Sequence, residues 1–151
     1  MCSSDLSLVK VEKQLPLDEA ALFGCAVITG AGAVFNTAKI RVGSTVAVVG
    51  LGGTGLAAIM GAKAAGASKI IGIDILQEKM DFAKQLGAQQ VFNAEDSSVV
   101  EKVKNFIANG VDYSFECVGS EKSMELAYKI LKRGGTAVSS GLSHPDKSFS
   151  I

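Results

Sequence analysis

The sequence has no excess of charge of either sign. Fifteen basic and fifteen acidic residues give a formal net charge of zero, and neither sign gathers into a cluster along the chain. Proteins whose main partner is nucleic acid usually carry a basic patch or stripe. The charge balance therefore indicates that nucleic acid is not the main partner of this chain.

Long apolar runs and a leader sequence are also missing. No uninterrupted apolar run approaches the ~20 residues that span a bilayer. The amino terminus has no basic region leading into an apolar stretch and a small-residue cleavage site, as a signal peptide would. We therefore expect no membrane partner and a cytoplasmic location.

Cysteine and histidine are scarce. The three cysteines, Cys2, Cys25 and Cys117, contain no CxxC pair and cannot form a disulfide framework, which fits a reducing compartment. The only histidine, His144, precedes Pro145 and is expected to be a surface loop residue rather than a metal ligand.

The composition is otherwise that of one globular domain, with 48% hydrophobic residues and 17 glycines in 151 positions. The acidic first turn after Pro16 predicts a helix that Gly24 interrupts. A second, wholly apolar helix is predicted over 26–38. Because that helix has no polar face of its own, the pattern suits burial against another domain.

A regular alternation of strands and helices follows. The β-branched run at 45–49 predicts a strand that is covered on both faces. Further strands are predicted at 69–73, 90–92, 112–117 and 136–140, with helices at 53–65, 77–86, 97–108 and 120–131. Such alternation predicts the α/β class, a doubly wound parallel sheet of the Rossmann type with five of the usual six strands.

A glycine-rich motif, Gly50-Leu51-Gly52-Gly53-Thr54-Gly55, comes directly after the first predicted strand and satisfies G-x-G-x-x-G. Such a loop turns tightly out of the strand and lets the backbone approach a pyrophosphate at the helix amino terminus. An isolated match to this motif is as often a purely structural turn as a nucleotide-binding loop. The preceding strand, the following helix and an acid after the second strand together predict a dinucleotide site.

That acid is Asp74, placed where the ribose hydroxyls of a dinucleotide should lie. A carboxylate accepts hydrogen bonds from a 2′-hydroxyl and repels a 2′-phosphate, by about 1 kcal/mol in water and about 4 kcal/mol at a partly shielded site. No arginine follows to compensate, so the predicted cofactor is NAD rather than NADP. The alternative for Asp74 is a solvated carboxylate that caps the next helix. The alternative for Lys79, the nearest cation, is an ordinary exposed helix lysine.

Three segments resemble the medium-chain, zinc-containing alcohol dehydrogenases: GCAVITGAGAV at 24–34, VGLGGTGLAAIMGAKAAGASKIIGID at 49–74 and VDYSFECVG at 111–119. The resemblance extends over residues 7–147. It implies hydride transfer between an alcohol and NAD, with zinc as the Lewis acid and an alcohol or aldehyde as the small-molecule substrate. It also implies a homo-oligomer for the full-length enzyme.

The resemblance implies a metal role for Cys25 as one ligand of the catalytic zinc, although a lone cysteine is more often a small buried hydrophobe. It implies no catalytic residue in this chain. It implies a set of cofactor contacts, several of them through the backbone. They are Thr29 beside the nicotinamide, Gly50, Leu51, Gly52, Gly53, Thr54 (where the family often has valine) and Gly55 in the glycine loop, Asp74 and Lys79 at the adenosine ribose, Cys117, Val118 and Gly119 along the cofactor, and Ser140, Gly141 and Leu142 at the carboxamide.

We expect this chain to be a fragment. A catalytic zinc needs three protein ligands, and only Cys25 is a candidate here, so zinc and turnover are expected only in the full-length enzyme. Residues 1–6 match no pattern. Residues 7–43 are expected to form a helical hinge segment to a catalytic domain, and 44–151 a Rossmann domain truncated at its carboxyl end.

Two alternatives remain. A fragment of a zinc-free quinone or enone reductase would usually lack the ligand at Cys25 and often prefer NADPH, so Cys25 and Asp74 count against it. A non-enzymatic NAD-sensing Rossmann module usually begins with its first strand, whereas about 40 residues precede it here.

Overall fold

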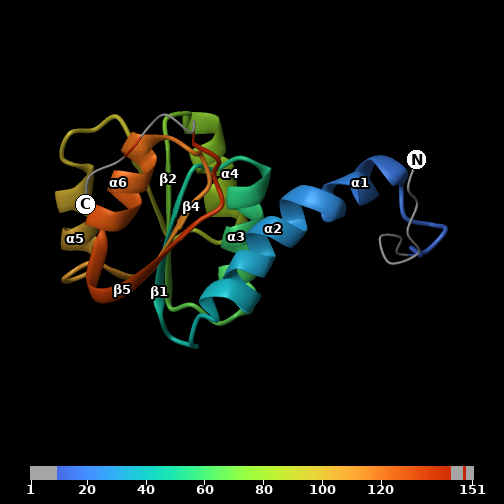
Figure 1. Cartoon of the computed structure of the whole chain (residues 1–151), viewed down its shortest axis with the longest axis horizontal. Coiled ribbons are helices and arrows are strands. Elements are labelled where there is room, and N and C mark those ends of the chain that lie inside the picture. The colour runs from blue at the N-terminus through green and yellow to red at the C-terminus, as the bar shows by residue number, and fades with distance from the viewer. Residues whose placement is uncertain (1–9, 144–147, 149–151) are drawn as a thin grey trace.

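A parallel sheet of five strands, in the order β3-β2-β1-β4-β5, forms the centre of the computed structural model, which describes residues 10–143 and 148. Residues 1–6 and His144 lie outside the described residues. Helices cover both faces of the sheet (Figure 1). The predicted doubly wound α/β fold is confirmed. The strands are β1 (Thr45–Val49), β2 (Lys69–Asp74), β3 (Gln90–Asn93), β4 (Val111–Glu116) and β5 (Leu131–Ser139).

The core lies in two layers, one on each face of the sheet. In β1, Val46 and Val48 face the layer of α3 (Gly53–Ala64) and α4 (Gln77–Leu86). Ala47 and Val49 face α5 (Val99–Phe106) and α6 (Glu121–Lys129). Because both faces are buried, the strand is apolar at every position from Val46 to Val49 instead of alternating.

The first helical segment is continuous. It consists of α1 (Leu17–Leu22), the π-helical turn η2 (Phe23–Val27), α2 (Ile28–Gly32) and the π-helical turn η3 (Ala33–Ala38). The predicted interruption at Gly24 is wrong. A glycine inside a helix costs about 1 kcal/mol, which a helix of this length tolerates.

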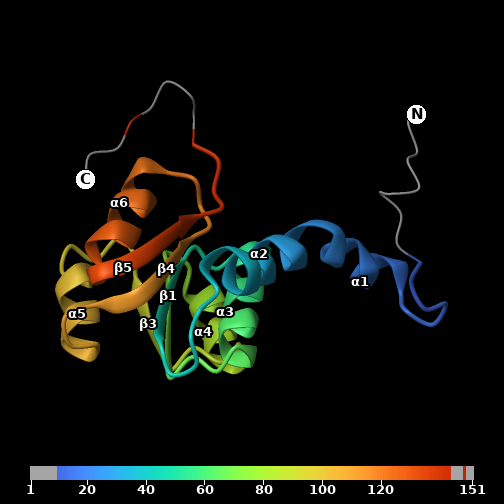
Figure 2. The same cartoon turned by 60° about the horizontal axis from the view of Figure 1, so that its bottom comes forward.

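This helix bears on the expectation of no membrane partner. Among the described residues, Leu17–Ala38 is the one helix that is long and apolar enough, by length and composition, to cross a membrane. Packed helices of other proteins pass the same test, and α2 packs against α3. Its amino-terminal part projects away from the sheet (Figure 2), and several large apolar side chains are exposed along it: Leu17, Leu22, Phe23, Ile28 and Phe35.

Most predicted boundaries agree with the structure within two residues, and the largest difference is at β5. This strand begins at Leu131 rather than at 136. It lies at the edge of the sheet, and its register against β4 shifts between Val111 and Tyr113. The run from Lys132 to Gly135 is typical of a turn, but an exposed edge strand accommodates polar residues and glycine there.

Candidate functional site

The candidate site lies at the carboxyl ends of β1, β2 and β4. Starting from β1, the chain adds β2 and β3 on one side and then crosses over to add β4 and β5 on the other. The crevice at such a reversal is the usual ligand site of open parallel sheets. Here it holds a cavity of about 740 Å³, lined among others by Gly50, Asp74, Lys79, Val118 and Lys122.

The glycine loop forms the floor of this crevice. Gly50 has a φ of 90°, a left-handed conformation that disfavours other residues. A Cβ atom on Gly55 would lie 1.8 Å from the carbonyl oxygen of Gly50, so the loop and α3 are in direct backbone contact. Helix α3 begins after Gly52 without a side-chain cap. Its first amide groups are therefore available to an anion.

Asp74 connects the glycine loop to the turn after β2. The residue is only 8% exposed. Its Oδ2 accepts a hydrogen bond from the amide of Leu51 at 2.7 Å. Its Oδ1 accepts from the amides of Ile75 and Leu76 at 2.8 and 3.0 Å. The carboxylate does hold the turn before α4, but it is buried rather than solvated, and it lines the cavity together with Lys79 of α4.

The segment after β4 forms the opposite wall. The Cys117 amide donates to the carbonyl of Val49 at 2.8 Å, which fixes the segment to β1. Val118 is exposed to the cavity, and its Cγ2 would lie 2.4 Å from a Cβ atom on Gly50. Burial, with a smaller contribution from the charge of Glu116, raises the pKa of the Cys117 thiol to about 12. Cys117 is therefore a neutral thiol at physiological pH.

Glu116 is a buried site residue that the sequence reasoning missed. It is 2% exposed, and its Oε1 accepts from the amides of Val118 and Gly119 at 2.7 and 2.6 Å. The hydroxyls of Ser123 and Ser139 also donate to this carboxylate, at 2.8 and 2.7 Å. The available signal was a carboxylate at the end of an apolar strand, which is also typical of a simple strand boundary.

The segment from Ser140 to Leu142 lies beside Gly119. The amide of Ser140 donates to the carbonyl of Glu116 at 2.8 Å. A Cβ atom on Gly141 would lie 2.1 Å from the Gly119 nitrogen. The structure thus brings this segment against the Cys117–Gly119 wall, although none of its residues lines the cavity itself.

The long helix places Thr29 and Cys25 near the glycine loop. A Cβ atom on Gly30 would lie 2.1 Å from the carbonyl oxygen of Thr54, so α2 and α3 approach without intervening side chains. A Cβ atom on Gly53 would likewise lie 3.2 Å from that of Ala26. Both Thr29 and Cys25 are exposed rather than buried in the core.

Cys25 does not belong to a metal-ligand cluster within 10–143. No group of three or more His, Cys, Asp or Glu side chains that could hold a metal ion occurs in this part of the chain. Because a zinc site needs at least three protein ligands, these residues do not form one. Cys25 is a single exposed thiol in the π-helical turn η2.

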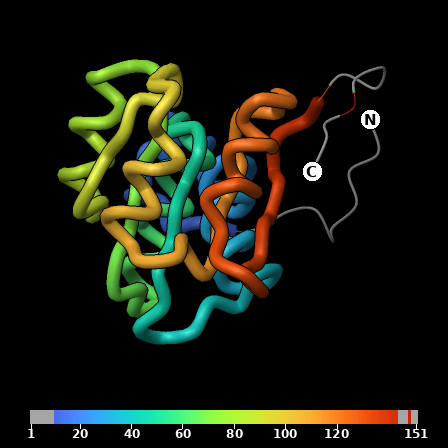
Figure 3. Tube along the Cα trace, turned by 90° about the vertical axis from the view of Figure 1, so that its left-hand side faces the viewer, coloured from blue at the N-terminus to red at the C-terminus, as the bar shows by residue number. Residues whose placement is uncertain are grey.

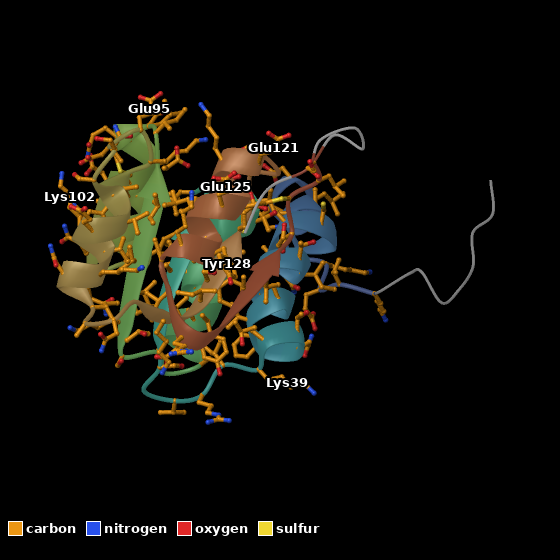
Figure 4. The ribbon with its side chains drawn as sticks, turned by 60° about the vertical axis from the view of Figure 1, so that its left-hand side comes forward. Lys39, Glu95, Lys102, Glu121, Glu125 and Tyr128 are labelled. Carbon is orange, nitrogen blue, oxygen red and sulfur yellow. The ribbon has the colours of Figure 1, made fainter. Side chains whose placement is uncertain are left out.

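Charged residues surround the mouth of the cavity. Glu95 follows β3, and Figure 4 shows it at the same end of the molecule as Glu121, opposite Lys39. Lys122 of α6 and Lys79 of α4 line the cavity together with Glu95. Neither Glu95 nor Lys122 was predicted, because exposed charges on loops and helix starts carry no spacing signal.

Comparison with known proteins gives consistent matches. The family model described as zinc-binding dehydrogenase matches residues 53–151. Alcohol dehydrogenase class-3 of Oryza sativa subsp. japonica is 45% identical over 149 residues, which is 97% of this chain and 39% of that protein. The Zea mays protein of the same name is 46% identical, again over 97% of this chain and 39% of the relative.

Solved structures agree with the sequence matches. The crystal structure of benzyl alcohol dehydrogenase from Acinetobacter calcoaceticus has a TM-score of 0.90 and 33% identity, covering 95% of this chain and 40% of that one. The chain thus spans about two fifths of the length of the proteins that it matches.

Proposed function

The chain belongs to the zinc-binding dehydrogenase family, and from this premise we propose that it binds NAD(H) as the cofactor domain of an alcohol dehydrogenase. The observation that carries the proposal is the bond between the Leu51 amide and Asp74 at 2.7 Å. This bond fixes the phosphate-binding loop and the ribose-binding acid relative to each other in one crevice.

Each part of the crevice suits one part of the cofactor. The free amides at the start of α3 suit the pyrophosphate. A carboxylate has about four lone-pair sites. Asp74 uses three of them on backbone amides, so one remains for a ribose hydroxyl. NAD supplies the hydride chemistry when bound, and this chain orients it between the glycine loop and the Cys117–Gly119 wall.

We further propose that the longer protein transfers hydride between an alcohol or aldehyde and NAD. In this proposal residues 7–43 are a hinge to the part that carries the remaining zinc ligands, and 44–151 bind the cofactor. The exposed apolar side chains of the long helix support an interdomain role, because large exposed apolar patches usually mark contact surfaces. Cys25 would supply one zinc ligand, and the chain alone should not turn over.

Two observations count against the alternatives. A zinc-free reductase does not need a thiol at the position of Cys25, and the matched relatives are named alcohol dehydrogenases. A free-standing nucleotide sensor does not need an apolar helix that projects from the domain.

The test is cofactor discrimination. We expect the chain to bind NADH more tightly than NADPH in calorimetric titrations. Asp74→Gly should reduce the ratio of the NADPH to the NADH dissociation constant at least fivefold, because about 1 kcal/mol of charge repulsion is removed. Asp81→Asn is the control, since it removes an exposed carboxylate of α4 outside the cavity. An unaltered ratio in Asp74→Gly would count against the proposed ribose contact, and no NADH binding would count against the function.

A further inference from the structure

We propose that Glu116 is a positioning residue of the cofactor site. Its carboxylate holds the Cys117–Gly119 wall and the end of β5 in the arrangement that the cofactor requires. The proposal rests on the proposed NAD(H) function and adds a residue that does not itself touch the ligand.

The carboxylate of Glu116 is saturated by donors from three elements. Oε1 accepts from the amides of Val118 and Gly119 in the cofactor wall and from the Ser123 hydroxyl of α6. Oε2 accepts from the Ser139 hydroxyl at the end of β5. A carboxylate offers about four acceptor sites, so none remains for a ligand. Glu116 differs in this respect from Asp74, which has one site free.

These contacts require an Oε1 that carries no proton. Backbone amides only donate, so a proton on Oε1 would face the hydrogens of two N–H groups whose nitrogens lie 2.7 and 2.6 Å from that oxygen. Bonds to a charged acceptor are about twice as strong as neutral ones. An amide in place of the carboxylate would keep one acceptor oxygen and lose the charge that strengthens all four bonds.

Ser123 and Ser120 connect the Glu116 carboxylate to the surface of the cavity by hydrogen bonds. The Ser123 hydroxyl has one hydrogen, and the charged Glu116 oxygen at 2.8 Å is its strongest nearby acceptor. The Ser120 hydroxyl lies 2.8 Å from the Ser123 hydroxyl and then donates its hydrogen to the Ser123 Oγ. The Ser120 Oγ in turn accepts a hydrogen bond from the Ser123 amide. This capping box begins α6, and Ser120 lines the cavity. The start of α6 therefore depends on the buried carboxylate.

The two segments held by Glu116 have no room to move separately. A Cβ atom on Gly141 would lie 2.1 Å from the Gly119 nitrogen and 2.8 Å from the Glu116 Oε2. A Cβ atom on Gly119 would lie 2.5 Å from the carbonyl oxygen of Leu142. Figure 3 shows the end of β5 beside α6. Any shift of the carboxylate therefore displaces the cavity wall and the Ser140–Leu142 segment together.

The experiment compares Glu116→Gln with Asp112→Asn in the 151-residue chain. Asp112 is the matched control because it lies on the same strand, also links strands through its carboxylate, and sits at the end away from the cavity. NADH binding is measured by the fluorescence of the bound cofactor. We expect Glu116→Gln to weaken NADH binding at least tenfold and Asp112→Asn by less than twofold, with both variants folded by circular dichroism.

Hydrogen exchange provides a readout that does not need the cofactor. Glu116→Gln should lose amide protection at Val118, Gly119 and Ser140, whereas Asp112→Asn should lose it near Thr45. If Glu116→Gln does not fold, Ser139→Ala takes its place, because it removes a single bond from Oε2. This variant should weaken NADH binding about threefold and reduce amide protection less than Glu116→Gln does, because the three bonds to Oε1 remain.

Each outcome decides one of the two proposals. Normal NADH binding by both the unchanged chain and Glu116→Gln overturns the positioning role alone. Equal weakening in Asp112→Asn also overturns it, because a general loss of stability would then explain the effect. Failure of the unchanged chain to bind NADH overturns the proposed function, and the role of Glu116 with it.

Discussion

Asp112 links three strands at the end of the sheet opposite the cavity, and its removal should destabilise the fold. Its Oδ2 accepts from both the amide and the hydroxyl of Thr45 at 2.7 Å, and the Asp112 amide donates to the same hydroxyl at 2.9 Å. Its Oδ1 forms an ion pair with Lys132 of β5. Asp112→Asn keeps one acceptor oxygen but removes the charge that Lys132 and Thr45 contact.

The magnitude follows from the ionisation of Asp112. Partial burial raises its pKa, but the hydrogen bonds from Lys132 and Thr45 outweigh this and lower the pKa from 3.8 to about 2. Without screening by solvent, a drop of that size corresponds to about 2.4 kcal/mol in the free energy of unfolding. Solvent reaches the side chain, and screening reduces the expected contribution to about 1 kcal/mol.

The direction of the pH dependence follows from the lowered pKa. The stabilisation is fully present above the unfolded pKa of about 3.9 and is lost as the pH falls towards 2. Urea unfolding at pH 7 should therefore show Asp112→Asn to be less stable by about 1 kcal/mol. The difference from the unchanged chain should shrink between pH 4 and pH 2. Equal stabilities at pH 7, or a difference that persists at pH 2, would refute this reasoning.

Two further predictions concern packing and thiol chemistry. Gly30→Ala should lower the free energy of unfolding by about 1–3 kcal/mol, because its Cβ would meet a backbone oxygen at 2.1 Å. Gly24→Ala, where nothing lies within 4 Å, should raise it by up to about 1 kcal/mol in the same thermal unfolding assay. Iodoacetamide at pH 8 should alkylate the exposed Cys25 well before Cys117, because a pKa of about 12 keeps the Cys117 thiol protonated. Peptide mass spectrometry measures the two alkylation rates. Equal rates would contradict the burial of the Cys117 thiol.

Strands covered on both faces were predictable because burial dictates their composition. β1 matches its predicted range because every position from Val46 to Val49 is buried. The predicted range of β5 did not match, because an edge strand is not buried on both faces. Polar residues and glycine, here Lys132 and two glycines, therefore occur within it. The continuity of the long helix was missed because a glycine disfavours a helix by only about 1 kcal/mol, and Gly24 lies within the π-helical turn η2.

The candidate site was predictable where chemistry depends on local spacing. The glycine loop and Asp74 follow strands that the sequence identifies, and parallel topology brings their ends together. The bonds that hold Asp74 to Leu51 and Glu116 to Ser139 join residues 23 positions apart in the chain. No periodicity encodes such contacts, so the bonding of both carboxylates emerges only in three dimensions.

β4 shows why residue type alone could not separate stability from function. Asp112 and Glu116 are both carboxylates, both stand beside apolar residues, and both accept bonds from neighbouring elements. In a parallel sheet, however, ligands bind at the carboxyl ends of the strands. The same kind of bond therefore secures the sheet at Asp112 and shapes the cavity wall at Glu116. If the two substitutions behave as expected, the partly exposed carboxylate at the amino end of β4 affects stability, and the buried carboxylate at its carboxyl end affects cofactor binding.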